Sequence, residues 1–105
     1  MNANLFAHLP GGLTEEGLER LAEAPGVWIE RIVSWGQASP AEGWYDQEQT
    51  EFVVLLQGEA RLEFADGTAR DLVAGDWVTL APHCRHRVGT TSIDPPAIWL
   101  AVHWR

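Results

Sequence analysis

Residues 75–86 read Gly75-Asp76-Trp77-Val78-Thr79-Leu80-Ala81-Pro82-His83-Cys84-Arg85-His86. A Gly-Asp turn, a short apolar run and a proline turn follow one another here, which predicts a short strand bounded by turns and followed by a histidine. Similar turn signals recur about every 8–11 residues, the spacing typical of an all-β sandwich or barrel. They lie at residues 57–59, 66–67, 74–76, 82–83 and 94–96.

The strands between these turns differ in their hydrophobic pattern. Residues 60–64 alternate between apolar and charged side chains, so one face of this strand is expected to be buried and the other wet. Residues 52–56 and most of residues 97–104 are apolar on both faces. Because a small barrel leaves one face of each strand in water, we expect both segments to be covered from outside. The N-terminal residues would cover one, and a second copy of the chain would cover the other, which predicts a homodimer.

The N-terminal residues are expected to form an extended arm over residues 1–13 and a short helix over residues 15–24. Thr14 is a suitable N-cap for this helix, and Pro25-Gly26 would end it. The arm and helix, residues 1–26, are assigned to the same domain as the barrel, residues 27–105. A chain of 105 residues is long enough for one core and too short for two.

Charge and composition exclude several classes of function. The formal net charge is −8, and the chain contains no lysine. Such a chain lacks the basic patch that binding to nucleic acids or anionic membranes requires, and it has no lysine for a Schiff base or a phosphate loop. Cys84 is the single cysteine, which excludes an intramolecular disulfide. A lone cysteine is typical of a reducing compartment, so we expect a cytoplasmic protein.

A second segment adds Gly43, Glu51 and Gly58, with six residues between the last two. Together with residues 75–86, this pattern resembles the small single-domain cupins of the cupin 2 conserved-barrel type. Their first motif runs Gly, His-x-His, Glu, Gly, and their second runs from a Gly-Asp turn through an apolar strand and a proline turn to a histidine. The resemblance implies an all-β fold, a double-sheet jelly-roll β-barrel with its site in the interior.

The same resemblance implies a metal site of three histidines and one glutamate facing into the barrel. Glu51 and His86 match two of its four positions, whereas Tyr45 and Gln47 stand where the family has the His-x-His pair. Tyr45 and Gln47 each carry an oxygen, but both are weaker ligands than imidazole for a first-row transition metal. The metal ligands implied here are Glu51, His86, Gln47 and Tyr45, and the ion would be Fe, Mn, Ni or Zn.

The alternation of side chains along each strand allows all four of these side chains to point into the interior of the barrel. Glu51 shares a face with Val53, and His86 points away from Arg85 and Arg87, whose charges indicate the wet side. Three interpretations of the cluster stay open. Glu51 and His86 form a buried hydrogen-bonded pair, or they bind a metal with one or two further donors, or they bind a ligand without metal.

Two more residues are candidates for the site. His103 would replace a missing metal ligand if its face of the last strand points inward, although its place near the end of the chain favours a position close to solvent. Most of the six tryptophans are expected in the core or in a subunit contact. Trp44 lies beside Tyr45 in a long segment between strands, so we expect it to contact a ligand at the mouth of the cavity.

The sequence therefore predicts a small barrel that binds a small polar ligand in its interior, with or without a divalent metal. Two further functions remain open. One is a metal-dependent enzyme, such as a dioxygenase, isomerase or lyase acting on a small polar substrate, and the other is a non-catalytic sensor or binding partner. An inward-facing His103 would favour the enzyme, because His86, His103 and Glu51 would supply two histidines and a carboxylate.

Overall fold

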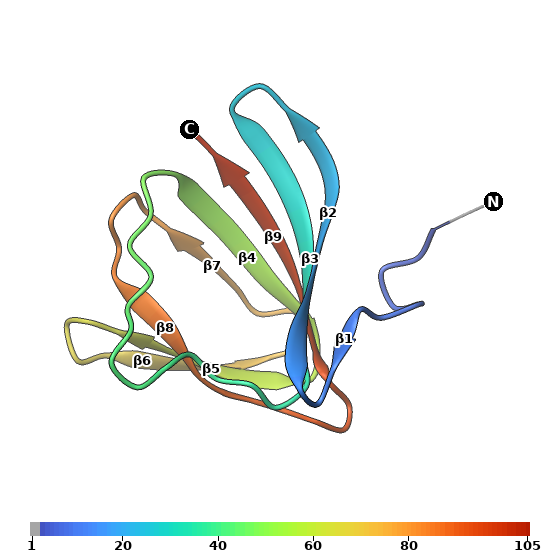
Figure 1. Cartoon of the computed structure of the whole chain (residues 1–105). Helices are drawn as coiled ribbons and strands as arrows, with labels where there is room; N and C mark the ends of the chain where they lie inside the picture. The colour runs from blue at the N-terminus through green and yellow to red at the C-terminus, as the bar shows by residue number, and fades with distance from the viewer. Residues whose placement is uncertain (1–2) are drawn as a thin grey trace.

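The computed structural model describes residues 3–105, whose regular elements are nine strands (Figure 1). The expected all-β class is confirmed. Within residues 3–105, no helix is long and apolar enough to cross a membrane. The strands are β1 (Gly11–Gly12), β2 (Glu15–Ala24), β3 (Val27–Ser34), β4 (Thr50–Gln57), β5 (Glu59–Phe64), β6 (Ala69–Val73), β7 (Trp77–Leu80), β8 (His86–Thr91) and β9 (Ala97–Trp104).

The strands form two sheets that face each other (Figure 1). The large sheet has the order β1-β2-β3-β9-β4-β7, and the small sheet has the order β6-β5-β8. The two layers fit a jelly roll, but they do not close into the expected barrel, because within residues 3–105 the edge strands β1 and β7 of the large sheet do not pair with a strand of the small sheet. Residues 35–49 run along this opening and meet β8 at an isolated bridge between Tyr45 and His86.

The predicted helix over residues 15–24 is wrong, since these residues form strand β2. β2 pairs antiparallel with β3 along most of its length. Pro25-Gly26, interpreted as the end of a helix, is instead the turn of this hairpin, and Gly26 adopts the φ of 77° that the turn requires. A lone short helix is marginal without a packed apolar face, and the apolar residue Leu18 in this segment is 64% exposed. Pairing with β3 therefore decides the conformation.

The hydrophobic core lies between the two sheets, and every strand that contributes to it does so with alternate residues. The expected alternation over residues 60–64 is confirmed, because Ala60 and Leu62 are buried while the intervening Arg61 and Glu63 are more exposed. On β4 the inward residues are Glu51, Val53 and Leu55. The other buried core residues are Leu72, Val78, Leu80, Ala97, Trp99 and Ala101.

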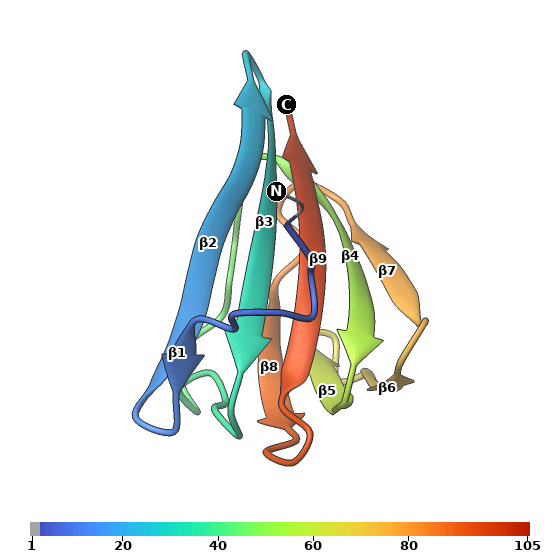
Figure 2. The same cartoon turned by 90° about the vertical axis from the view of Figure 1, so that its right-hand side faces the viewer.

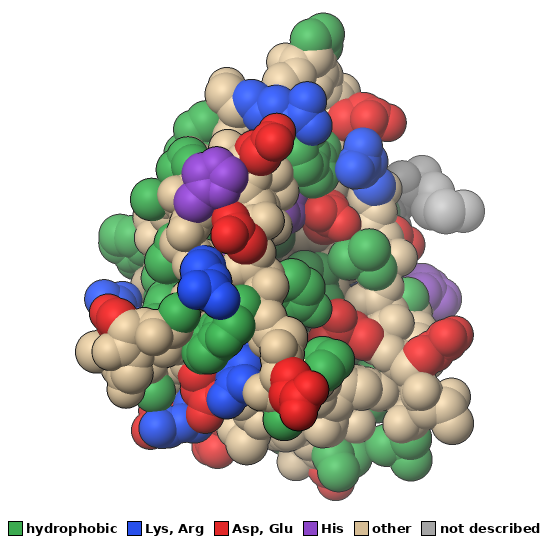
Figure 3. All heavy atoms as spheres, turned by 60° about the vertical axis from the view of Figure 1, so that its left-hand side comes forward, with side chains coloured by type: hydrophobic (Ala, Val, Ile, Leu, Met, Phe, Trp, Pro, Cys, Tyr) green, Lys and Arg blue, Asp and Glu red, His purple; other side chains and the backbone are tan. Residues whose placement is uncertain are grey.

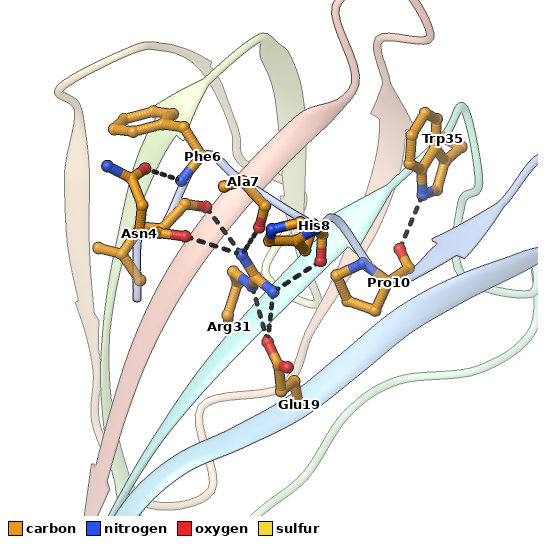
Figure 4. Close-up of polar contacts among 9 residues, drawn as sticks. Asn4, Phe6, Ala7, His8, Pro10, Glu19, Arg31 and Trp35 are labelled. Carbon is orange, nitrogen blue, oxygen red and sulfur yellow. Dashed lines mark hydrogen bonds and ion pairs between the residues drawn. The ribbon is translucent and has the colours of Figure 1, made fainter. Parts of the chain in front are cut away.

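The N-terminal arm crosses the outer face of the large sheet, over β3 and toward β9 (Figure 2). Arg31 of β3 points outward into this arm and is only 5% exposed (Figure 4). Its guanidinium donates hydrogen bonds to the carbonyl oxygens of residues 4, 5, 7 and 8, and it forms an ion pair with Glu19 of β2. One buried cation thus holds the arm against the sheet.

Candidate functional site

A cavity of about 490 Å³ opens between the two sheets. Val53, Leu80 and Trp99 of the large sheet and Leu62 and Val88 of the small sheet form its apolar wall. In the space-filling view, part of a histidine is visible in a hollow that hydrophobic and acidic side chains border (Figure 3). The polar side chains that line the cavity are Glu16, Glu30, Gln37, Ser39, Tyr45, Gln47, Glu51, His86 and His103. The cavity therefore brings together Tyr45, Gln47, Glu51, His86 and His103, the five residues assigned from the sequence to a metal site.

Glu51 lies on the inward face of β4 and is 8% exposed. Its Oε1 accepts a hydrogen bond of 2.8 Å from Nε2 of Gln47, and Oε1 of Gln47 accepts one of 3.1 Å from Nε2 of Gln49. An ionised carboxylate can only accept, so Gln47 must turn its amide nitrogen toward Glu51. These two hydrogen bonds fix the Gln47 side chain, and the second one occupies its amide oxygen.

His86 begins β8 and is 5% exposed. Its Nδ1 lies 2.8 Å from the carbonyl oxygen of Cys84, which can only accept, so Nδ1 carries the proton. Nε2 is then the nitrogen with a free lone pair. The Tyr45 ring lies 5.5 Å from the His86 ring, between centroids, but Tyr45 is 51% exposed and belongs to the rim of the cavity.

His103 is 6% exposed and lines the cavity, so the expectation that it ends the last strand near solvent is wrong. β9 has paired neighbours on both sides up to its end, with Trp28 opposite His103 on β3 and Glu51 opposite it on β4. The Trp28 indole stacks on the imidazole at a centroid distance of 5.1 Å. Nε2 of His103 lies 3.0 Å from Oε1 of Glu30, yet neither ring nitrogen has an aligned hydrogen-bond partner.

Sequence reasoning missed the carboxylates of Glu16 and Glu30. Oε1 of Glu30 accepts a hydrogen bond of 3.2 Å from the Trp28 indole, and Oε2 of Glu16 accepts one of 2.7 Å from the Ser34 hydroxyl. Glu30 could have been found, because Trp28, Glu30 and Ile32 alternate along β3 and so share one face of the strand. Glu16 could not, because its segment was taken for a helix, in which it would have faced solvent.

Trp44 does not line the cavity, although the sequence predicted that it contacts a ligand. Its neighbour Tyr45 turns toward His86, and Trp44 packs instead under the Arg87 guanidinium, 4.6 Å from the ring centroid. His83, in the turn after β7, is exposed, and its Nδ1 lies 2.7 Å from Oδ1 of Asp46. None of these side chains lines the cavity.

The sequence model of the cupin domain (Cupin_2) matches residues 33–103, which contain the whole small sheet and, in the large sheet, β4, β7 and most of β9. The matched residues include Glu51, His86 and His103. The chain belongs to the cupin family. No curated protein matches this cupin.

Solved structures support the assignment. A candidate mannose-6-phosphate isomerase from Ralstonia eutropha JMP134 is 45% identical, with a TM-score of 0.92 and coverage of 99% of this chain and 97% of that one. A Cupin 2 conserved barrel domain protein from Salinispora arenicola CNS-205 is 28% identical, with a TM-score of 0.69 and coverage of 86% and 76%. A cupin superfamily protein from Desulfitobacterium hafniense DCB-2 is 20% identical, with a TM-score of 0.77 and coverage of 91% and 83%.

The side chains of this cupin do not fit the usual family metal site of three histidines and one glutamate. Gln47 presents N–H groups to Glu51, and a metal ion cannot bind to them. Tyr45 lies at the rim and is half exposed. Among residues 3–105, no group of three or more His, Cys, Asp or Glu side chains is arranged to hold a metal. Glu51 and His86 remain as two donors, fewer than the three or four protein ligands of a typical first-row metal site. His103 also faces the cavity, but within residues 3–105 it does not complete a metal-holding group with them.

Proposed function

We propose that this cupin binds a small polar ligand directly through the side chains of its cavity, without a metal ion between protein and ligand. The hydrogen bond from Gln47 to Glu51 carries the proposal, because it turns two of the four family metal positions into a hydrogen-bonded pair. His86 supports it, since its protonated Nδ1 is held by a backbone carbonyl and its Nε2 is free to accept a hydrogen bond. The apolar wall would bury the rest of the ligand.

The experiment combines metal analysis with a ligand screen on protein purified without a histidine tag. We expect well under one equivalent of Fe, Mn, Ni or Zn, and small polar compounds that raise the melting temperature of the wild type but not of Glu51→Ala or His86→Ala. The matched control is His8→Ala, which lies in the arm, and it should respond like the wild type. Stoichiometric metal that is lost in both site variants would contradict the proposal and support a metal-dependent enzyme.

A second candidate function is sugar-phosphate isomerisation, because the protein from Ralstonia eutropha is 45% identical and is described as a candidate mannose-6-phosphate isomerase. The cavity weighs against it. No Lys or Arg is among the described residues that line the cavity, whereas three glutamates are, and a phosphate dianion would be buried among like charges. Conversion of mannose 6-phosphate to fructose 6-phosphate, abolished in Glu51→Ala, would establish this candidate instead.

We also propose that the protein is a cytoplasmic homodimer that forms through the outer face of the large sheet. The arm covers the β3 side of this face, but Trp77 of β7 remains 60% exposed beside Phe52 of β4, with ring centroids 5.5 Å apart. Covering these apolar side chains would contribute about 1.5–3 kcal/mol each. Light scattering should give twice the chain mass of 11.7 kDa, and Trp77→Glu should shift the protein toward monomer.

A further inference from the structure

Three carboxylates line the cavity from β2, β3 and β4 of the large sheet, and each accepts a hydrogen bond from an uncharged group. Glu16 accepts from the Ser34 hydroxyl, Glu30 from the Trp28 indole and Glu51 from the Gln47 amide. A hydrogen bond from a neutral donor stabilises a carboxylate without cancelling its charge. Compensation of these charges must therefore come from another source.

The arginines of the chain do not provide it. Within residues 3–105, their ion pairs are with Glu19, Glu23, Glu63 and Asp71, and none of these four lines the cavity. Arg20 and Arg105 lie over the Trp28 indole at 5.4 and 5.3 Å from its centroid, and neither lines the cavity. Among the described residues that line the cavity, the basic side chains are two histidines, and none is an arginine.

His103 adds an independent observation. It is 6% exposed, it lines the cavity, and neither of its ring nitrogens has an aligned hydrogen-bond partner. Buried polar groups in folded proteins almost always have a partner, because leaving one unpaired is destabilising. Glu51 lies opposite His103 in the β4–β9 ladder, and Oε1 of Glu30 lies 3.0 Å from Nε2 of His103, within ion-pair distance but without hydrogen-bond alignment. His103 therefore lies on the strand between the strands that carry these two carboxylates.

We infer that the ligand of this cavity is a small organic cation, a protonated amine, whose ammonium group is held between Glu30 and Glu51 and donates a hydrogen bond to the free ring nitrogen of His103. This inference rests on the proposed function, because it names the class of ligand for the same cavity. An ammonium group is suited to the site, since it has several N–H donors and no acceptor, and the carboxylates of Glu30 and Glu51 can accept hydrogen bonds from it. The carbon chain of the amine would lie along Val53 and Leu80.

Calorimetric titration with three four-carbon probes tests the inference. Butane-1,4-diamine, butane-1,4-diol and succinate have similar lengths and differ in charge. We expect the diamine to bind at least tenfold more tightly than the diol, and succinate to show no binding. Glu30→Gln, which can still accept from Trp28, should weaken the diamine at least tenfold. Glu23→Gln, on the exposed part of β2, is the matched control and should bind the diamine like the wild type.

Several outcomes would overturn the inference. Equal affinity for diamine and diol, abolished in His86→Ala, would show a polar ligand site without charge selection, so the proposed function would stand and the inference would fall. Diamine binding that persists in Glu30→Gln and in Glu51→Gln would place the amine elsewhere. Tighter binding of succinate, or no binding of the diamine, would equally reject an amine ligand, and the ligand screen would then decide the proposed function by itself.

Discussion

Arg31 and His103 are two buried polar residues on adjacent strands of the same sheet, and they differ in their hydrogen bonding. Arg31 on the outer face of β3 is 5% exposed, and His103 on the inner face of β9 is 6% exposed. The guanidinium of Arg31 has a carboxylate and four backbone carbonyls as partners. The imidazole of His103 has no aligned partner on either nitrogen.

The difference separates a structural role from a functional one. A buried polar group with every donor satisfied stabilises the fold, whereas an unsatisfied one reduces stability and persists where another function requires it. Arg31 therefore has a structural role, because it holds the arm in place (Figure 4), whereas His103 is assigned a role in the cavity that it lines. Four substitutions test this distinction.

Arg31→Ala should have the largest effect on stability. It leaves the carbonyls of the arm without their donor, so we expect the free energy of unfolding to fall by about 3 kcal/mol in urea titrations. Hydrogen exchange in residues 4–8 should increase at the same time. Arg61→Ala is the control, because this exposed arginine pairs with Asp71 on the surface, and its loss should cost less than about 1 kcal/mol. If the two variants lowered the free energy of unfolding equally, Arg31 would contribute no more to stability than an arginine on the surface.

Gln47→Glu should come next. It places a second carboxylate against Glu51, where the amide now donates at 2.8 Å, and should lower the free energy of unfolding at pH 7 by about 1–2 kcal/mol. One carboxyl of the pair then has a raised pKa in the folded state, so the loss appears as the pH rises above the normal glutamate range and disappears near pH 4. The double variant with Glu51→Gln exchanges the two groups and should restore stability. A loss independent of pH would exclude repulsion as the cause.

His103→Phe should change stability little, and in the favourable direction. A ring of similar shape without unpaired nitrogens removes a buried unsatisfied group and keeps the stacking on Trp28, so we expect a gain of up to about 1 kcal/mol. Ligand binding should be lost in the same variant. A loss of stability comparable to that of Arg31→Ala would mean that His103 is structural after all.

The smallest effect concerns Asp66, a satisfied polar group at the surface. Hydrogen bonds from the side chain and backbone of Thr68 lower the pKa of Asp66 below its usual 3.8. A lowered pKa contributes stability above the unfolded-state pKa, and this contribution is lost as the pH falls through the folded-state value. Asp66→Asn should therefore slightly reduce the dependence of the free energy of unfolding on pH at acid pH. Chemical denaturation between pH 2 and 6, a range around the ordinary carboxylate pKa, would detect this change. An identical pH dependence in both proteins would show that the turn does not depend on the charge.

Hydrophobic alternation and turn residues were enough to predict the strands of the fold but not the conformation of its N-terminal part. The alternation over residues 60–64 and the Asp66-Gly67 turn are local signals, because side-chain facing and backbone φ depend on neighbouring residues. Residues 15–24 have a pattern compatible with a helix as well as a strand, and pairing with β3 decided between them.

The sequence by itself determined that the chain is all-β, that it resembles the cupins, and that Glu51 and His86 face the interior, since motif spacing and strand parity are properties of neighbouring residues. Only the tertiary structure decided which groups these side chains meet. Gln47 turns its amide to Glu51, and His103 stands beside Glu30 without an aligned partner, because β3, β9 and β4 are adjacent in the sheet although they are far apart in the chain. The position of a residue in its own strand sets the direction of its side chain. The residues that this side chain contacts lie on adjacent strands, and no local sequence pattern says which strands are adjacent.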